Sequence, residues 1–276
     1  MAIAKISREE IARRLHSTVD KGKPIIGVGC SCGLFAKCAE LGGVDLIIVY
    51  STGISRLKGL PTWIIGDSNE ITLRMIEEIS HVVKHTPIIA GVEGCDPTRE
   101  MDKYIEEIIA VGASGIINFP TLALGERNEY WRKSKEDVGW GLDREVAMIR
   151  SAHEMGLFTL CYVRFNGDAV EMVHAGADMV CVHGGRTAGG LVGRKNAPSL
   201  KENVRQVNAM ARVVHEVNPK VFIVQHGGSV ATPDDTTYIY QNSKAVGYIG
   251  ASSFERIPIE QALIQIAQDY KSKKLP

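Results

Sequence analysis

The sequence lacks the features that mark several large classes of protein. It has 32 basic and 32 acidic residues among 276, and this balance argues against general binding to nucleic acid or to a membrane surface. No apolar run reaches the roughly 20 residues that a membrane-spanning helix needs. The residues after Met1 lack the apolar core of a signal peptide, so we expect a cytoplasmic protein without nucleic-acid or membrane partners.

Cysteine is present, but without the spacing of a disulfide framework or a cysteine-based metal site. The six cysteines include no Cys-x-x-Cys pair, and most of them lie inside or beside apolar segments. This distribution is typical of reduced thiols in a cytoplasmic protein.

Eight short apolar segments alternate with eight amphipathic ones. The apolar segments are predicted strands, apolar on both faces like parallel strands covered by helices, at 24–29, 44–50, 87–92, 115–119, 158–163, 179–183, 221–225 and 246–249. The predicted helices between and after them lie at 34–41, 70–83, 101–111, 144–155, 169–174, 200–217, 234–242 and 260–271. Eight strand–helix units in about 250 residues predict an α/β fold, a (β/α)₈ TIM barrel.

An additional helix is predicted before the first strand. A serine–glutamate capping box at 7–10 precedes apolar residues at helical spacing. We therefore predict a single TIM-barrel domain over 1–276. Its extra N-terminal helix lies in 1–22 and covers the bottom of the barrel, and the barrel itself occupies 23–276.

Two histidines stand at predicted strand ends. His183 ends the sixth strand and His226 ends the seventh, each just before glycines. The carboxyl ends of barrel strands converge on one mouth, where a neutral imidazole can serve as a general base or a metal ligand. The alternative is a histidine that is hydrogen-bonded to a neighbouring loop in a structural role. Either histidine is a candidate acid or base.

Other polar side chains follow the earlier strands. Glu93 and Asp96 after strand three could act as a base or hold a divalent cation such as Mg²⁺, although Asp96 precedes Pro97 and could instead cap a helix. Tyr50 and Asn118 end strands two and four and are candidates to assist catalysis and to orient the substrate. The sequence contains no dense cluster with metal-ligand spacing, so it assigns no metal ligands.

Glycine-rich turns follow the last two strands, and the second turn opens a helix. Such turns can hold a phosphate or carboxylate with backbone N–H groups and hydroxyls, or they can serve backbone geometry alone. The substrate-binding candidates in and after these turns are Gly227, Gly228, Ser229, Gly250, Ser252, Ser253 and Arg256. Arg256 could alternatively pair with Glu255.

Three predicted loops on the same face of the barrel are long, at 51–67, 120–142 and 184–198. The last one combines five glycines with Arg186, Arg194 and Lys195. A glycine-rich basic loop is typical of a mobile lid that closes on an anion, and a flexible solvated loop is the alternative.

Seven segments of the sequence resemble one known family. They are KPIIG at 23–27, KC at 37–38, GGVDLI at 42–47, VKHTP at 83–87, NFPT at 118–121, HGG at 226–228 and GASSFER at 250–256. Together they resemble the phosphoenolpyruvate hydrolase-like TIM-barrel family, which also forms the carboxyl-terminal barrel of tobamovirus-resistance-type proteins behind an ATP-binding-like domain.

The resemblance implies a barrel related to the phosphoenolpyruvate mutase and isocitrate lyase group, and a homo-oligomer. The chain departs from that group at the end of strand two. Tyr50 and Ser51 stand there where the group has part of a closely spaced acidic cluster for Mg²⁺.

The function predicted from these features is that of an enzyme. It is a hydrolase or lyase that cleaves a C–C or P–O bond in a small phosphorylated or carboxylated oxo-acid, with the anion held by the glycine turns after strands seven and eight. The alternative is a non-catalytic ligand-sensing or scaffold barrel that works with an ATP-binding-type partner protein.

Overall fold

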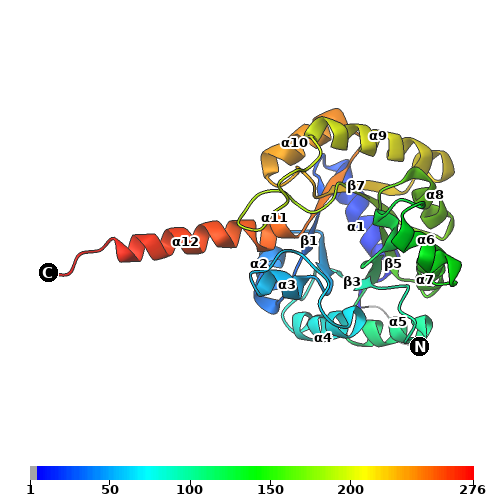
Figure 1. The fold of residues 1–276 in the computed structure, drawn as a ribbon, viewed down its shortest axis with the longest axis horizontal. Coiled ribbons are helices and arrows are strands. Elements are labelled where there is room, and N and C mark those ends of the chain that lie inside the picture. The colour runs from blue at the N-terminus through cyan, green and yellow to red at the C-terminus, as the bar shows by residue number, and fades with distance from the viewer. Residues whose placement is uncertain (1–4) are drawn as a thin grey trace.

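Eight parallel strands form a closed barrel in the computed structural model, which describes residues 5–276 (Figure 1). Each strand pairs with the next along the chain, and β8 closes the barrel on β1. The strands are β1 (Ile25–Gly29), β2 (Leu46–Val49), β3 (Ile88–Val92), β4 (Gly115–Asn118), β5 (Phe158–Val163), β6 (Met179–His183), β7 (Phe222–His226) and β8 (Gly247–Gly250). The predicted (β/α)₈ TIM barrel is thus confirmed.

Alternate residues of each strand point into the barrel and out toward the helices. In β2, Leu46 and Ile48 belong to the inner cluster of buried side chains, whereas Ile47 and Val49 belong to the outer one. Both clusters exclude water, which explains why the strands are apolar on both faces. Most polar side chains of the strands lie near their carboxyl ends, and these ends form the rim that carries the candidate site.

The helices surround the barrel. They are α1 (Arg8–Asp20), α2 (Gly33–Leu41), α3 (Gly53–Leu57), α4 (Ser68–Ser80), α5 (Met101–Ala110), α6 (Tyr130–Asp137), α7 (Leu142–Glu154), α8 (Asn166–His174), α9 (Leu200–Val217), α10 (Pro233–Asn242), α11 (Ser252–Glu255) and α12 (Ile257–Lys271), with a short 3-10 helix η1 (Leu122–Leu124). Two of the long predicted loops thus contain short helices of their own, α3 in one and η1 and α6 in the other.

The N-terminal helix α1 closes the bottom of the barrel. Ser7 caps it by accepting a hydrogen bond from the Glu10 amide. Ile11 and Leu15 on its inner face are fully buried in the cluster that fills the barrel interior. Arg8 pairs with Asp178, which lies just before β6, at 2.8 Å. The extra N-terminal helix predicted from the sequence is therefore present and serves as a plug.

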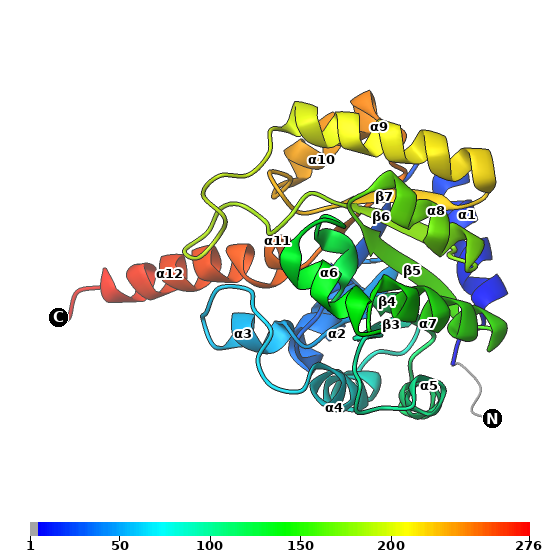
Figure 2. The ribbon, with the colours of Figure 1, turned by 45° about the vertical axis from the view of Figure 1, so that its right-hand side comes forward.

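Helix α12 departs from the expected arrangement. It projects away from the barrel (Figures 1 and 2), and none of its side chains is buried. Its exposed apolar residues include Leu263, Ile264, Ile266 and Tyr270. The eighth predicted helix is thus helical, but it does not pack along its own barrel.

None of the helices within residues 5–276 combines the length and apolar character needed to cross a bilayer.

Replacing Leu15 by Ala should lower the free energy of unfolding by about 2–5 kcal/mol, because the substitution leaves a cavity in the plug. Leu191→Ala is the matched control, since Leu191 is 74% exposed and Leu15 only 1%. Denaturant unfolding of both variants measures the difference. Equal stability of the two variants would show that α1 is not part of the cooperative core.

Candidate active site

A cavity of about 580 Å³ opens at the carboxyl ends of the strands. Side chains from β5, β6 and β7, with Tyr50 directly after β2, form its base, and the loops after β2, β4 and β6 form its walls. The residues that line it are Tyr50, Thr52, Arg56, Thr62, Trp63, Ile64, Phe119, Pro120, Thr121, Leu124, Tyr162, Arg164, His183, Gly185, Arg186, Thr187, Arg194, His226, Ala251 and Ser252. This is the face on which barrel enzymes build their active sites.

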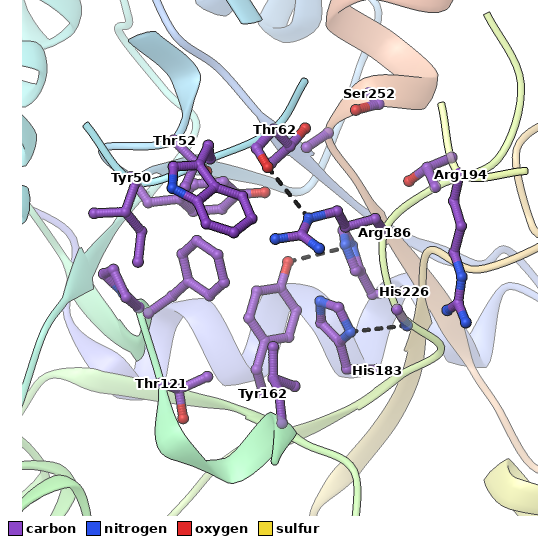
Figure 3. A pocket seen from close by; sticks show the side chains of 18 of the residues that line it. Tyr50, Thr52, Thr62, Thr121, Tyr162, His183, Arg186, Arg194, His226 and Ser252 are labelled. Carbon is purple, nitrogen blue, oxygen red and sulfur yellow. Dashed lines mark hydrogen bonds between the residues drawn. The ribbon is translucent and has the colours of Figure 1, made fainter. Parts of the chain in front are cut away.

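Three rings in mutual contact form the centre of the base (Figure 3): Tyr162 meets His183 edge to face, and His226 is tilted against both. The ring centroids of His183 and His226 lie 4.5 Å apart, and Tyr162 lies 4.9 Å from each of them. The Tyr162 hydroxyl oxygen lies 3.3 Å from Nδ1 of His226. The two histidines predicted from the sequence therefore meet in one pocket, beside a tyrosine to which the sequence assigned no role.

The hydrogen bonds of His226 identify which ring nitrogen carries the proton when the imidazole is neutral. Its Nδ1 lies 2.7 Å from the carbonyl oxygen of Ile249, which can only accept a hydrogen bond, so Nδ1 carries the proton. Nε2 is then left with a free lone pair. Burial lowers the pKa of His226 to about 4, the Ile249 carbonyl opposes this shift, and Arg56 adds to it. At neutral pH His226 is thus an uncharged base.

His183 has the opposite tautomer. Its Nδ1 accepts a hydrogen bond from the backbone N–H of Gly185 at 3.0 Å, so the proton of the neutral ring is on Nε2. Burial holds the pKa of His183 well below its usual value, and His226 and Arg164 lower it further. The pair therefore offers one nitrogen that accepts a proton and one that donates a hydrogen bond.

Tyr50 lines the same cavity, as its position at the end of β2 predicts. Burial raises its pKa to about 12, so the phenol stays protonated at neutral pH. The guanidinium of Arg56 lies 5.5 Å from the Tyr50 ring centroid and forms a buried ion pair with Glu255. Arg56 and this pair were missed from the sequence, because 199 residues separate its two members.

Three more arginines line the cavity without a carboxylate partner among residues 5–276. They are Arg164 at the end of β5 and Arg186 and Arg194 from the loop after β6. Arg186 donates from Nε to the carbonyl of Thr62 and lies over the Trp63 ring. No aspartate or glutamate lines this cavity in the described part of the chain. The electrostatics of the site therefore favour an anion.

The glycine turn after β7 supports the loop after β6. Gly227 and Gly228 have φ values of 68° and 65°, and a methyl group added at Gly227 would clash with the carbonyl oxygen of Gly185. The Gly228 amide donates to that same carbonyl, at 2.9 Å. Neither glycine lines the cavity. The two glycines fix the base of the arginine-bearing loop and do not face the cavity, whereas their contact with an anion stays a prediction.

Most of the other predicted binding residues have protein partners instead of facing the cavity. Ser229 accepts a hydrogen bond from Asn203, and Ser253 bonds the hydroxyl of Tyr248. A methyl group at Gly250 would clash with Ser253 Oγ, so this glycine allows close packing of the turn. Ser252 alone of this group lines the cavity.

Arg256 holds the tip of the loop after β6 from outside the cavity. It donates to the carbonyl of Gly189 at 2.9 Å and pairs with Glu260 at 3.1 Å. The Glu260 carboxylate also accepts from the Leu191 amide. Arg256 therefore pairs with Glu260 and not with Glu255, and it contacts the loop after β6 and does not line the cavity.

The acidic candidates after β3 lie outside the cavity. Asp96 accepts from Asn69 and from both the amide and the hydroxyl of Thr98. It does not cap a helix, because α5 begins at Met101. Burial raises the pKa of Glu93. Its backbone N–H donates a hydrogen bond to Asn69 Oδ1, and its carbonyl oxygen accepts one from Asn69 Nδ2. The structure does not bring either carboxylate to the histidines.

Asn118 is buried behind the cavity wall. It donates to Glu145 at 2.8 Å and accepts from the Tyr162 amide at 2.7 Å. Glu145 also accepts from the Leu122 amide at 2.6 Å and from Thr121, which lines the cavity. Burial raises the pKa of Glu145 to about 7, against these hydrogen bonds. Sequence reasoning missed Glu145 because it sits inside an ordinary helical pattern.

The site does not have the donor set of a magnesium centre. Mg²⁺ prefers oxygen ligands, and it is usually held by one or two carboxylates. Within residues 5–276 no group of three His, Cys, Asp or Glu side chains could hold a metal ion. The cavity instead presents arginine guanidinium groups, which a divalent cation would repel.

Comparisons with known proteins agree with this architecture. The model of the phosphoenolpyruvate hydrolase-like family matches residues 10–273. The chain belongs to this family. It is similar to two proteins of tomato (Solanum lycopersicum). The ToMV susceptible protein tm-1(GCR26) is 42% identical over 95% of this chain. The ToMV resistance protein Tm-1(GCR237) is 41% identical over 96% of this chain. The chain spans only 35% and 36% of their lengths.

Solved structures share the fold of this phosphoenolpyruvate hydrolase-like protein at low sequence identity. Phosphonopyruvate hydrolase complexed with oxalate and Mg²⁺ is 20% identical, with a TM-score of 0.62 over 95% of this chain and 87% of that one. Oxaloacetate acetylhydrolase with its product oxalate is 14% identical, with a TM-score of 0.62 over 98% and 91%. The barrel is therefore shared with enzymes of the phosphoenolpyruvate mutase/isocitrate lyase superfamily.

The tautomers of the two histidines give the first prediction for this site. Long-range ¹H–¹⁵N spectra at pH 7 should show the proton of His226 on Nδ1 and that of His183 on Nε2. On acidification His226 should stay neutral until about pH 4 because burial penalises its charged form. Exposed His81 serves as the internal reference. A cationic His226 at pH 6 would contradict the assignment.

The lowered pKa of His226 also makes the free energy of unfolding depend on pH. The native state binds the His226 proton only near pH 4, whereas the unfolded chain binds it near 6.5, so the stability falls as the pH drops between these values. The loss is about 3 kcal/mol at 1.36 kcal/mol per pKa unit. A comparison of urea unfolding for the wild type and His226→Gln at pH 7 and pH 4.5 isolates this contribution.

Proposed function

We propose that this protein is a hydrolase or lyase that cleaves a C–C or P–O bond in a small phosphorylated or carboxylated oxo-acid. One observation carries the proposal. Two buried neutral histidines of complementary tautomer lie in a cavity that is also lined by arginines without acidic partners among residues 5–276. The cavity volume suits a small molecule, and its charge suits a carboxylate or phosphate.

The roles of the side chains follow from their protonation. Arg164, Arg186 and Arg194 bind the anionic groups of the substrate, since guanidinium forms paired hydrogen bonds with carboxylate and phosphate. His226 accepts a proton at Nε2 from a hydroxyl group or a water molecule. His183 donates from Nε2–H to the oxygen on which charge develops, and the protonated phenol of Tyr162 is a second donor.

Structural relatives support the substrate class. Oxalate is bound in the structures of phosphonopyruvate hydrolase and oxaloacetate acetylhydrolase, and both enzymes share this fold. Oxaloacetate, which has a C–C bond to cleave, and phosphoenolpyruvate, the enol phosphate of an oxo-acid with a P–O bond to cleave, are accordingly the first compounds to assay. Product formation can be followed by ¹H and ³¹P NMR, which detect cleavage of either a C–C or a P–O bond.

His226→Gln should lower turnover of the accepted substrate by about 10²–10⁴-fold, the range for loss of a general base. Glutamine keeps an amide donor for the Ile249 carbonyl, so the melting temperature should stay close to that of the wild type. The matched control is His81→Gln, which changes an exposed histidine far from the cavity. Unchanged turnover in His226→Gln would remove the role of this residue.

A second candidate function is a ligand-sensing or scaffold barrel that works with an ATP-binding-type partner protein. It is favoured by the lengths of the tomato relatives, in which about two thirds of each chain lies outside the matched region. Tight binding of one of the oxo-acids without any turnover, in the presence and absence of ATP, would favour this function over catalysis.

We also propose that α12 packs on a second copy of the chain in a homo-oligomer. Its apolar residues Leu263 and Ile266 are exposed, and so are Leu34 and Leu41 on α2. Both sets of side chains would lose contact with water if helices of two copies met at these surfaces. The free thiols of all six cysteines agree with the proposed reducing, cytoplasmic location.

Light scattering after size exclusion should give the mass of a dimer or a larger oligomer for the wild type. The double variant Leu263→Glu/Ile266→Glu should shift it toward monomer, because burying these charges is unfavourable. The double variant Gln261→Glu/Gln268→Glu adds the same charge to α12 at polar positions and should leave the mass unchanged. A monomeric wild type would refute the oligomer.

A further inference from the structure

We propose that the cavity holds the carboxylate groups of its ligand directly through arginine, with no divalent cation between ligand and protein. The inference rests on the proposed function, because it concerns the same cavity and the same class of ligand. It sets this site apart from the Mg²⁺-containing structure that shares its fold.

The carboxylates near the rim are already engaged by protein groups. Glu255 is paired with Arg56 through Oε2, and its Oε1, although without a hydrogen-bond partner among residues 5–276, is buried and does not line the cavity. Glu145 accepts from Asn118, Thr121 and the Leu122 amide. Asp168 on α8 is fully buried between Arg127 and Arg132. Over residues 5–276, no acidic side chain faces the cavity. The carboxylate oxygens that usually hold Mg²⁺ are therefore absent from its wall.

The histidines cannot replace those ligands. The Nδ1 atoms of His183 and His226 are occupied by the Gly185 amide and the Ile249 carbonyl. At most one nitrogen of each ring remains for a metal, and two imidazole nitrogens do not make a site for a hard cation. Both rings also have their pKa values lowered in part by nearby arginines. The same positive charge would repel a bound cation.

The arginines have the chemistry that an oxo-acid needs. Arg164 comes from the end of β5, and Arg186 and Arg194 come from the loop after β6, so cationic residues line the cavity from two elements. Each guanidinium can form two parallel hydrogen bonds with one carboxylate. A small dicarboxylate or 2-oxo-carboxylate could thus be bound at its acid groups by arginine, while His183 Nε2–H and the Tyr162 hydroxyl remain for an oxo oxygen.

Titration calorimetry with sodium oxalate on the intact protein tests this directly. Excess EDTA should leave the affinity unchanged, and excess MgCl₂ should weaken the apparent affinity because Mg²⁺ competes for free oxalate. Arg194→Gln and Arg186→Gln should each weaken binding by about 10-fold or more, the effect of losing a charged hydrogen-bond partner. Arg212→Gln, at an exposed position of α9 that does not line this cavity, is the matched control and should bind like the wild type.

A second titration needs no ligand. Paramagnetic Mn²⁺, added to the wild-type protein and followed by electron paramagnetic resonance, should show no stoichiometric site. One bound Mn²⁺ per chain that is lost in the double variant His183→Gln/His226→Gln would overturn the inference, whatever the protein catalyses.

The outcomes separate the inference from the proposed function. Oxalate binding that requires Mg²⁺ would overturn the metal-free site and leave an oxo-acid enzyme in place. Absence of oxalate binding under every condition, together with no turnover of any oxo-acid, would overturn both the ligand class proposed here and the function on which it rests.

Discussion

The parallel register between β6 and β7 is the constraint on which the candidate site depends. It pairs His183 with His226 across neighbouring strands, and β5 places Tyr162 beside Cys181 in the next pair. Because the barrel is closed, these strand ends cannot separate, and the three rings are held in contact at its mouth. A slip of one residue in β7 would turn His226 toward the helices and remove its imidazole from the cavity.

Burial at the mouth then sets the electrostatics of the site. Both imidazoles remain uncharged at neutral pH because a desolvated cation is unfavourable, and the nearby arginines reinforce this effect. The positive charge of the cavity therefore comes from guanidinium groups, which stay protonated in any environment. In the proposed function, binding of the anion and proton transfer are thus assigned to different side chains.

The sequence predicted the fold and the two histidines because both depend on local patterns. Apolar segments of strand length identify β1 to β8, and a histidine just before glycines at a strand end is visible without coordinates. Pairings between distant segments were not visible. Arg56 meets Glu255 across 199 residues, and Glu145 reaches Asn118 from a helix whose pattern shows only one more buried position.

Glycine was the least informative residue type for function. The positive φ of Gly227 and Gly228 could be anticipated, but the group that approaches them could not, and it is the carbonyl of Gly185 and not a ligand. Arginine was more informative about the site than glycine. A basic glycine-rich loop indicated an anion, and the structure places Arg186 and Arg194 of that loop on the wall of the cavity.

The first turn of α12 links two parts of the molecule that have been described separately. Arg256 and Glu260 form hydrogen bonds with Gly189 and Leu191 at the tip of the arginine-bearing loop. No side chain of the helix itself is buried. Under the proposed packing of α12 on a second copy of the chain, that copy would hold the helix whose base anchors the loop tip through Gly189 and Leu191. Assembly of the oligomer and access of small molecules to the cavity would then be coupled.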